Sequence, residues 1–313
     1  MKSSAMTICV ATLTLLVAVP GLSESSGQQG QGRAIVTVLP KRTGQALPEI
    51  RVKDLSVKVN RKEARITDLM PFKGTEGRVE LVLLIDSSAR MSLGTQLNDI
   101  ANYIQSLPAN TRAAIAYMFN GKAFFAGPLS ADHAQVLREL HLPGGLPGSS
   151  ASPYICLSDL ARRWPSKDRM ARRVAVMVTD GVDYYERRYD PEDPYVLAAI
   201  TDSVRAGLSV YAIYWLNQGF ASRTYYAMYD GQNLLQEVTD ATGGISYWQG
   251  TGNPVTFVPY FEDLSRRLAN QYEIVFTCPL RGKAEAEDLK VKLDVAGAKL
   301  DAPQRAWVVP AGF

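Results

Sequence analysis

Two aspartates that could carry chemistry each close a nearly continuous apolar run. Asp86 ends VELVLLID (79–86), and Asp180 lies at the end of RVAVMVTDG (173–181). Apolar runs of this length are typical of strands that are buried on both faces of a parallel sheet. Ligands of such sheets bind outside the carboxyl ends of the strands. We therefore expect both carboxylates at one edge of a sheet.

Hydroxyl side chains accompany these carboxylates. Ser88 follows Asp86 by two positions, and Gly148 to Ser152 (GSSAS) forms a hydroxyl-rich loop before an expected helix. Mg²⁺ takes octahedral oxygen ligation and often leaves a position open for a partner's carboxylate. The hypothesis is a divalent-cation site, for Mg²⁺ or Mn²⁺, among these carboxylate and hydroxyl groups. Taken singly, each aspartate is better explained as a helix cap or a loop hydrogen bond; their recurrence at the ends of two buried strands, with a hydroxyl-rich loop between them, favours the site.

Aromatic and basic side chains follow the same group of strands. VDYYERRYDP (182–191) comes directly after Asp180, and RTYYAMY (223–229) follows a strand that ends at Trp215. Tyrosine and arginine dominate protein-binding hot spots, because they bury a large area at little rotamer cost. The expected partner contacts are Arg90, Tyr184, Tyr185, Arg187, Tyr225 and Tyr226. The alternative is that these tyrosines only cover the sheet and keep their hydroxyl groups in water.

Enzyme motifs are absent from the sequence. It contains no GxSxG, no GK[ST] after its Gly-rich stretch and no GxGxxG after the first buried strand. The two histidines, His133 and His141, are expected to be ordinary surface residues. A hydrolase with an acid/base pair made of Asp86 and Asp180 is the least favoured reading. The chain is therefore expected not to be an enzyme.

Strands and helices alternate along the middle of the chain. Strands are expected at 79–86, 111–119, 122–129, 173–181, 208–215 and 245–249. Helices are expected at 95–107, 130–140, 153–164, 193–207, 233–244 and 257–272. This alternation predicts an α/β fold with a doubly wound, mostly parallel sheet that has helices on both faces.

Both ends of the chain read as short strands. They are expected at 34–40, 55–60, 64–71, 272–279, 288–295 and 305–310, with a turn-like stretch at 296–304. Neither end holds enough strands for an independent unit, so we expect the two ends to form one small β-sandwich-like domain. The predicted division is a signal peptide (1–23), a flexible leader (24–33), an N-terminal β segment (34–76), an α/β domain (77–271) and a C-terminal β segment (272–313).

The N-terminal sequence and the amino-acid composition indicate the compartment of the protein and the class of its partners. Met6 to Val19 is an uncharged apolar run after Lys2, shorter than the ~20 residues of a spanning helix. This layout predicts a cleaved secretory signal, an extracytoplasmic protein (periplasmic or secreted) and no membrane span after cleavage. An uncleaved anchor is the alternative. Lys+Arg 34 against Asp+Glu 31 gives +3, which is too balanced to indicate a nucleic-acid partner.

Cysteines and paired arginines are expected to be structural. Cys156 and Cys278 should be separately buried thiols, with a disulfide as the alternative. The paired arginines at 162–163, 172–173 and 266–267 are expected to be solvated positions on helices or loops.

The acidic loops resemble the metal-ion-dependent adhesion site of von Willebrand factor A (VWA) domains. That site uses a DxSxS loop, a Thr from a second loop and an Asp from a third. The resemblance covers about residues 80–271, and the flanking strands are similar to those of secreted VWA-related proteins of acidobacteria. It implies the DxSxS positions for Asp86 and Ser88, and the third-loop position for Asp180. The second-loop Thr then matches Ser152, or Ser150 if the loop is read two residues earlier.

One position departs from this pattern. Arg90 stands where the third DxSxS residue is Ser, and a guanidinium has five donors and no acceptor. Arg90 either turns away while Ser92 or water fills the gap, or it pairs with Asp86 or Asp180 and leaves a metal-free fold.

The function expected from these observations is binding. An exported VWA-like protein would mediate protein–protein interaction or adhesion through its strand-end site, with a cation that accepts a partner's acidic side chain. The alternative is a metal-free structural scaffold of an envelope assembly.

Overall fold

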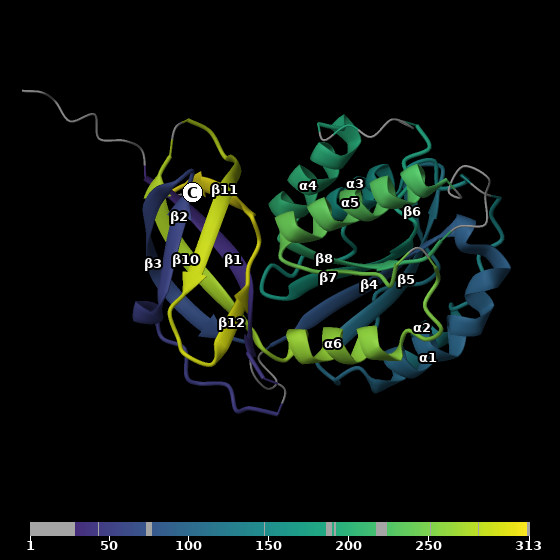
Figure 1. Ribbon diagram of the computed structural model, residues 1–313, viewed down its shortest axis with the longest axis horizontal. Helices are drawn as coiled ribbons and strands as arrows, with labels where there is room; N and C mark the ends of the chain where they lie inside the picture. The colour runs from purple at the N-terminus through teal and green to yellow at the C-terminus, as the bar shows by residue number, and fades with distance from the viewer. Residues whose placement is uncertain are drawn as a thin grey trace, which may run out of the picture.

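The computed structural model of the chain describes residues 29–42, 44–72, 77–146, 148–185, 190, 192–216, 224–250, 252–280 and 282–311, without the side chains of residues 90 and 91. The predicted signal peptide (1–23) therefore lies outside the described residues. Two units make up the molecule: an α/β unit from the middle of the chain and a β unit from its two ends (Figure 1). Among the helices described, none is long and apolar enough to cross a membrane.

The α/β unit is built on one six-stranded sheet. Its order is β6 (Lys122–Phe125), β5 (Thr111–Phe119), β4 (Val79–Asp86), β7 (Arg172–Thr179), β8 (Leu208–Tyr214) and β9 (Ser246–Tyr247). All neighbours pair in parallel except β5 and β6, which form an antiparallel hairpin. Every residue of β4 and β8 is buried, because helices cover both faces of the sheet. The predicted α/β fold with a mostly parallel sheet is confirmed.

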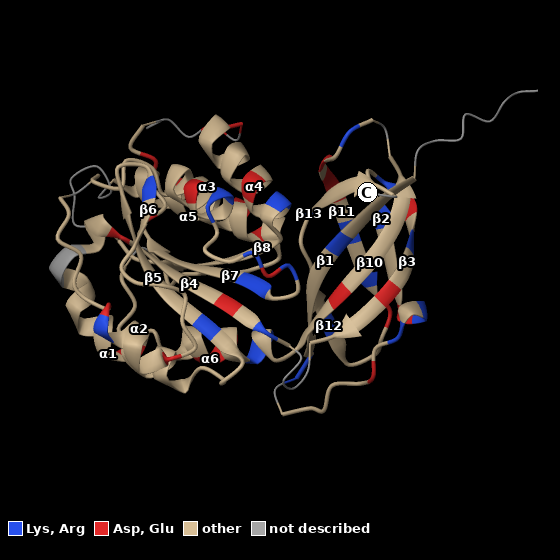
Figure 2. Cartoon of the chain, turned by 180° about the vertical axis from the view of Figure 1, so that it is seen from behind, with Lys and Arg blue, Asp and Glu red and all other residues tan. Residues whose placement is uncertain are grey.

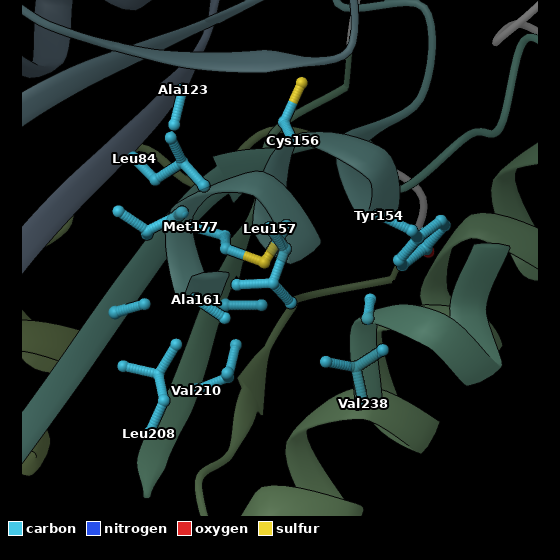
Figure 3. Close-up of a cluster of buried hydrophobic side chains, with 14 of the residues drawn as sticks. Leu84, Ala123, Tyr154, Cys156, Leu157, Ala161, Met177, Leu208, Val210 and Val238 are labelled. Atoms are coloured by element: carbon cyan, nitrogen blue, oxygen red, sulfur yellow. The ribbon is translucent and has the colours of Figure 1, made fainter. Parts of the chain in front are cut away.

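Helices lie on both faces of this sheet (Figure 1). One face carries α3 (Pro153–Arg162), α4 (Pro194–Ala206) and α5 (Tyr225–Thr242). The other carries the 3₁₀ segment η3 (Ser87–Gln96) with α1 (Leu97–Ser106), α2 (His133–Arg138) and α6 (Val258–Leu268). In the first core, Leu157 of α3 and Val238 of α5 lie around Leu84 and Met177 of the sheet (Figure 3).

The β unit closes into a barrel. Its strands are β1 (Gln29–Pro40), β2 (Leu55–Val59), β3 (Lys62–Pro71), β10 (Gln271–Pro279), β11 (Glu285–Leu293), β12 (Ala298–Asp301) and β13 (Arg305–Pro310), with the 3₁₀ turn η1 (Val52–Asp54) before β2. The order β10-β3-β2-β11-β13-β1 returns to β10, and β12 adds to β1. The two ends of the chain do pair, but the predicted β-sandwich is wrong. Because β1 is long enough to pair with both β10 and β13, the sheet has no open edge at which to split.

The first strand begins earlier than predicted. Residues 29–33 were expected in the flexible leader (24–33), but they pair with β10 from Gln29 opposite Pro279. Their inward positions are glycines, so the hydrophobic pattern of a strand is missing. At Gly32 an added Cβ would lie 2.4 Å from the Phe276 ring, which shows that the ring fills the place of a side chain.

Other elements differ in length from the expectations. Helix α5 begins at Tyr225 instead of 233, with Thr224 as its N-cap. The strand expected over 122–129 ends at Phe125, and the turn-like stretch 296–304 contains β12. Ser152 caps α3 and Gly207 ends α4 in the left-handed conformation (φ 66°), as predicted.

The cysteine prediction is confirmed, whereas the arginine prediction is wrong at two positions. Cys156 and Cys278 are free and buried. Arg172 and Arg267, expected to be solvated, are buried where the two units meet. Arg267 pairs with Asp301 of the barrel at 2.6 Å, so its charge is neutralised there.

Candidate functional site

The candidate site lies at the carboxyl ends of β4 and β7. Asp86 is the last residue of β4, and Thr179 is the last residue of β7, its parallel neighbour. The amino ends of these strands face the barrel, so the site lies at the far end of the α/β unit (Figure 1). We call the described segments at that end, 87–96, 141–146, 148–152, 180–185, 224–229, 248–250 and 252–257, the strand-end rim.

Asp86 joins three segments of this rim. Its Oδ1 accepts a hydrogen bond from the backbone N–H of Ser88 at 2.8 Å. Its Oδ2 accepts from the hydroxyl groups of Thr179 at 2.8 Å and Ser150 at 3.4 Å. Ser88 Oγ in turn accepts from the backbone N–H of Gly148 at 3.1 Å. One carboxylate thus holds together the ends of β4 and β7 and the loop before α3.

The surroundings of Asp86 are dry and contain no described cation. Asp86 is 2% exposed, and none of the lysine or arginine side chains that the structure describes forms an ion pair with it. Burial raises the pKa of Asp86, while the hydrogen bonds from Ser88, Thr179 and Ser150 work in the opposite direction. The net effect is a pKa above the ordinary value of an aspartate. The carboxyl group of Asp86 acts as a hub that accepts hydrogen bonds from three neighbouring residues.

The two serines of the second loop have different roles. Ser150 is the one that reaches Asp86. Ser152 instead caps α3 and donates to Asp183 at 2.7 Å. Of the two alternatives for the second-loop position, Ser150 is the one whose hydroxyl group lies at Asp86, whereas Ser152 lies at Asp183. The cause is local: the left-handed conformation of Ala151 (φ 66°) turns successive side chains to different neighbours.

The third loop is held by its own carboxylates. Asp180 accepts from the backbone N–H of Val182 at 3.0 Å and from the Tyr184 hydroxyl group at 3.4 Å. Asp183 accepts from the backbone N–H of Tyr185 at 2.7 Å as well as from Ser152. The backbone N–H of Tyr184 also donates to the carbonyl of Ala151. Asp180 is brought to the same rim as Asp86, but it orders its own loop.

Close packing against Gly231 of α5 holds the backbone of the third loop in place. A Cβ added to Gly231 would lie 2.2 Å from the backbone oxygen of Asp180, so only glycine allows this approach. Tyr154 of α3 donates to the carbonyl of Gly181 at 2.7 Å. Burial, together with the nearby Asp183 and Asp180, raises the pKa of Tyr154, so this phenol stays a donor.

The oxygen atoms around Asp86 are of the kind that Mg²⁺ takes. Their arrangement is closed on itself, however, because protein donors already occupy Asp86 and Ser88. Within the described ranges, no group of three His, Cys, Asp or Glu side chains could hold a metal ion. The remaining DxSxS position is Arg90, which has no acceptor atom and whose side chain lies outside the description. A cation at this position would have to displace the donors that Asp86 and Ser88 now accept from.

The predicted contact residues divide into two groups. Tyr185, Tyr225 and Tyr226 are exposed, Tyr225 at 71%. Tyr184 is half-buried between the second and third loops and helps to hold the site together. Arg187 lies outside the described residues, as does the side chain of Arg90.

Thr179 and Asp183 were not predicted as site residues. Thr179 had a usable signal, because it ends a buried strand in register with Asp86 on the neighbouring strand. Asp183 had no such signal in the sequence, since its role depends on a loop conformation that brings it to Ser152.

Comparisons with known proteins add the following. No family model matches the sequence, and no curated protein matches it. Solved structures that are similar include BatB from Bacteroides thetaiotaomicron, with 14% identity and a TM-score of 0.46 over 61% of this chain and 97% of that chain. A second is the von Willebrand factor domain of a type V pilus tip protein from Porphyromonas gingivalis, with 10% identity and a TM-score of 0.41 over 61% and 94%.

A third similar structure is a proximal thread matrix protein of the mussel byssus with a zinc-occupied adhesion motif, with 13% identity and a TM-score of 0.40 over 68% of this chain and 49% of that chain. These scores are low, so we draw no conclusion about this chain's activity from them. The structure itself shows an α/β unit with the Asp86 and Asp180 loops at one edge of its sheet, which is the arrangement expected from the sequence resemblance.

Proposed function

We propose that this chain is an exported binding protein whose VWA-like unit contacts a protein partner through the strand-end rim. The observation that carries the proposal is the distribution of exposed large apolar side chains. Among the described residues, eight of the sixteen lie on the rim: Leu142, Leu146, Tyr185, Tyr225, Tyr226, Tyr229, Trp248 and Val255. Exposed apolar groups that cluster in this way mark interaction surfaces.

The rim has the composition and the support of a binding surface. Val255 is 94% exposed and Tyr225 71%, so these side chains offer most of their area to a partner. The Tyr185 ring lies 6.0 Å from the Tyr195 ring at the start of α4, which extends the aromatic area. Beneath them, Asp86 and Asp183 fix the loops through buried hydrogen bonds. A fixed surface loses less entropy on binding than a flexible one.

Site-specific photo-crosslinking tests this proposal. A photoreactive phenylalanine analogue replaces Tyr225 on the rim and, as the control, Val52 on the exposed face of the barrel. Illumination of the producing cells should give a defined adduct from position 225 and none from position 52. Equal adducts from both positions, or none from position 225, would contradict the proposal.

A cation-dependent version is the second candidate. It is favoured by the gathering of the Asp86 carboxylate with the hydroxyl groups of Ser150 and Thr179. In that version the partner would supply an acidic side chain to the ion. Calorimetry separates the two: the primary proposal predicts no saturable heat with Mg²⁺ or Mn²⁺, and weak binding only in Arg90→Ser, which removes a positive charge and supplies a hydroxyl group. Saturable heat in the wild type would favour the second candidate.

A further inference from the structure

A second surface with a distinct chemistry lies at the opposite end of the α/β unit. A cleft of about 810 Å³ separates the amino ends of β7 and β8 from β1 and β13 of the barrel. Its walls come from both units, with Arg33 and Trp307 on the barrel side and Trp164 and Arg173 on the α/β side. Pockets that bind small organic ligands have volumes of roughly 300–1,000 Å³. The cleft is therefore of a size for such a ligand.

The lining of the cleft is strongly basic. Its cationic residues are Arg33, Arg162, Lys167, Arg169, Arg172, Arg173, Arg205 and Arg305. Among the described residues that line the cleft, the one acidic side chain is that of Glu273, and it pairs with Arg33 at 2.5 Å. The whole chain is nearly balanced in charge. The lining of this cleft is therefore much more basic than the chain as a whole, and blue segments of the ribbon lie near β7 and near β1 (Figure 2).

Several of these cations lack a carboxylate partner. Within the described residues, Arg162, Lys167 and Arg169 form no ion pair and are exposed. Arg172 is only 5% exposed, and its guanidinium donates to neutral oxygens of Gly77, Leu268 and Gln271. The Nε of Arg172 has no hydrogen-bond partner. Burial lowers the pKa of Arg172 to about 10, as expected for a cation that is not neutralised.

Aromatic rings hold three of the guanidinium groups in place. Arg205 lies over the Trp307 ring at 4.6 Å, Arg172 over the Phe72 ring at 4.6 Å and Arg173 over the Trp164 ring at 5.8 Å. Stacking of this kind orients the planar guanidinium without cancelling its charge. Arg173 also donates to the carbonyls of Ala206 and Ser166. Two further cations of the cleft pair with carboxylates, Arg205 with Asp202 at 3.8 Å and Arg305 with Asp288 at 3.2 Å. Within the described residues, the donors that an anion can use without first displacing a carboxylate are those of Arg162, Lys167, Arg169, Arg172 and Arg173.

We propose that this cleft binds a small organic polyanion, a molecule that carries two or more phosphate or carboxylate groups. Arginine matches both groups through paired N–H donors, and bonds of this kind are stronger than those between neutral groups. The cations without a carboxylate partner lie on the α/β wall of the cleft, so this wall supplies the direct contacts, while Arg33 and Arg305 of the barrel wall are paired with Glu273 and Asp288. This site is independent of the strand-end rim, so the proposal stands whether or not the rim binds a protein.

Titration calorimetry of the whole mature protein at low ionic strength tests the proposal. Pyrophosphate and citrate serve as probes, so that the phosphate and carboxylate sources of the charge are separated. We expect saturable binding of at least one probe in the submillimolar range, a rise in melting temperature with its concentration, and weakening of both effects by added NaCl.

Two matched variants locate the binding. K167A/R169A removes two exposed cations of the cleft that form no ion pair, and K290A/K292A removes two exposed cations of β11 outside it. The cleft variant should raise the Kd at least about tenfold, which corresponds to about 1.4 kcal/mol, and the β11 variant should leave it unchanged.

Three results would overturn the proposal: no saturable binding of either probe, an unchanged Kd in K167A/R169A, or binding of a Glu₁₀ peptide alone. The last result would assign the cleft to an acidic polypeptide instead.

Discussion

Replacement of Asp86 tests its role as the hub of the strand-end rim. In Asp86→Ala the backbone N–H of Ser88 and the hydroxyl groups of Ser150 and Thr179 lose their acceptor in a place that water does not reach. Each buried donor without a partner costs about 1–3 kcal/mol, and the two hydroxyl groups can rotate toward other acceptors. Loss of the buried charge offsets part of the cost. We expect a net destabilisation of about 3 kcal/mol.

Asp86→Asn is the matched variant. Asparagine keeps the size of the side chain and one acceptor oxygen, and it removes the charge whose burial raises the pKa of Asp86. Its stability should lie within about 1 kcal/mol of the wild type. Urea unfolding followed by circular dichroism gives both values, and hydrogen exchange shows whether the amide of Ser88 loses protection in the alanine variant. Equal free energies of unfolding for Asp86→Ala and Asp86→Asn would refute the role of Asp86 as a hydrogen-bond hub.

Three further predictions concern other parts of the chain. Burial raises the pKa of Asp263, but the hydrogen bonds from Arg267, Arg266 and Tyr247, together with the charge of Arg267, outweigh it and lower the pKa. Asp263→Asn should therefore cost about 2 kcal/mol at pH 7, and this difference should shrink as the pH falls through the lowered pKa in an acid-unfolding series. Gly231→Ala places a methyl group against the backbone after β7 and should lower the stability by about 2 kcal/mol in urea unfolding, unless α5 shifts without cost. N-terminal sequencing of the exported protein should begin near residue 24; a chain that still starts at Met1 would refute cleavage.

The sheet could be predicted from the sequence because its signal is local. The apolar runs that end at Asp86 and Asp180 are buried strands, and in a parallel sheet their carboxyl ends share one edge whatever the loops do. Chain direction alone therefore brought the two loops together. The choice between Ser150 and Ser152 depended on the backbone turn at Ala151, for which the sequence has no signal.

The barrel and the cleft depend on contacts between distant parts of the chain. The start of β1 cannot be recognised in the sequence, because Gly30 and Gly32 stand where a strand normally has inward-facing apolar residues. The space next to these glycines is filled by side chains of β13 and β10. Arg172 resembles a solvated arginine in the sequence, and only the junction of the two units buries it. The pairing of strands from the two ends of the chain is set by closure of the sheet into a barrel. Local sequence patterns do not encode this closure.

The most direct test of the account is the capture of partners from the extracytoplasmic fraction of the producing cells. The baits are the wild type, Y225S/Y226S on the rim and V52S/M70S on the exposed barrel face, each with and without a chelator. The account predicts a protein that the wild type and the barrel variant retain, that the rim variant loses, and that the chelator does not release. Equal retention by all three baits, or release by the chelator alone, would contradict it.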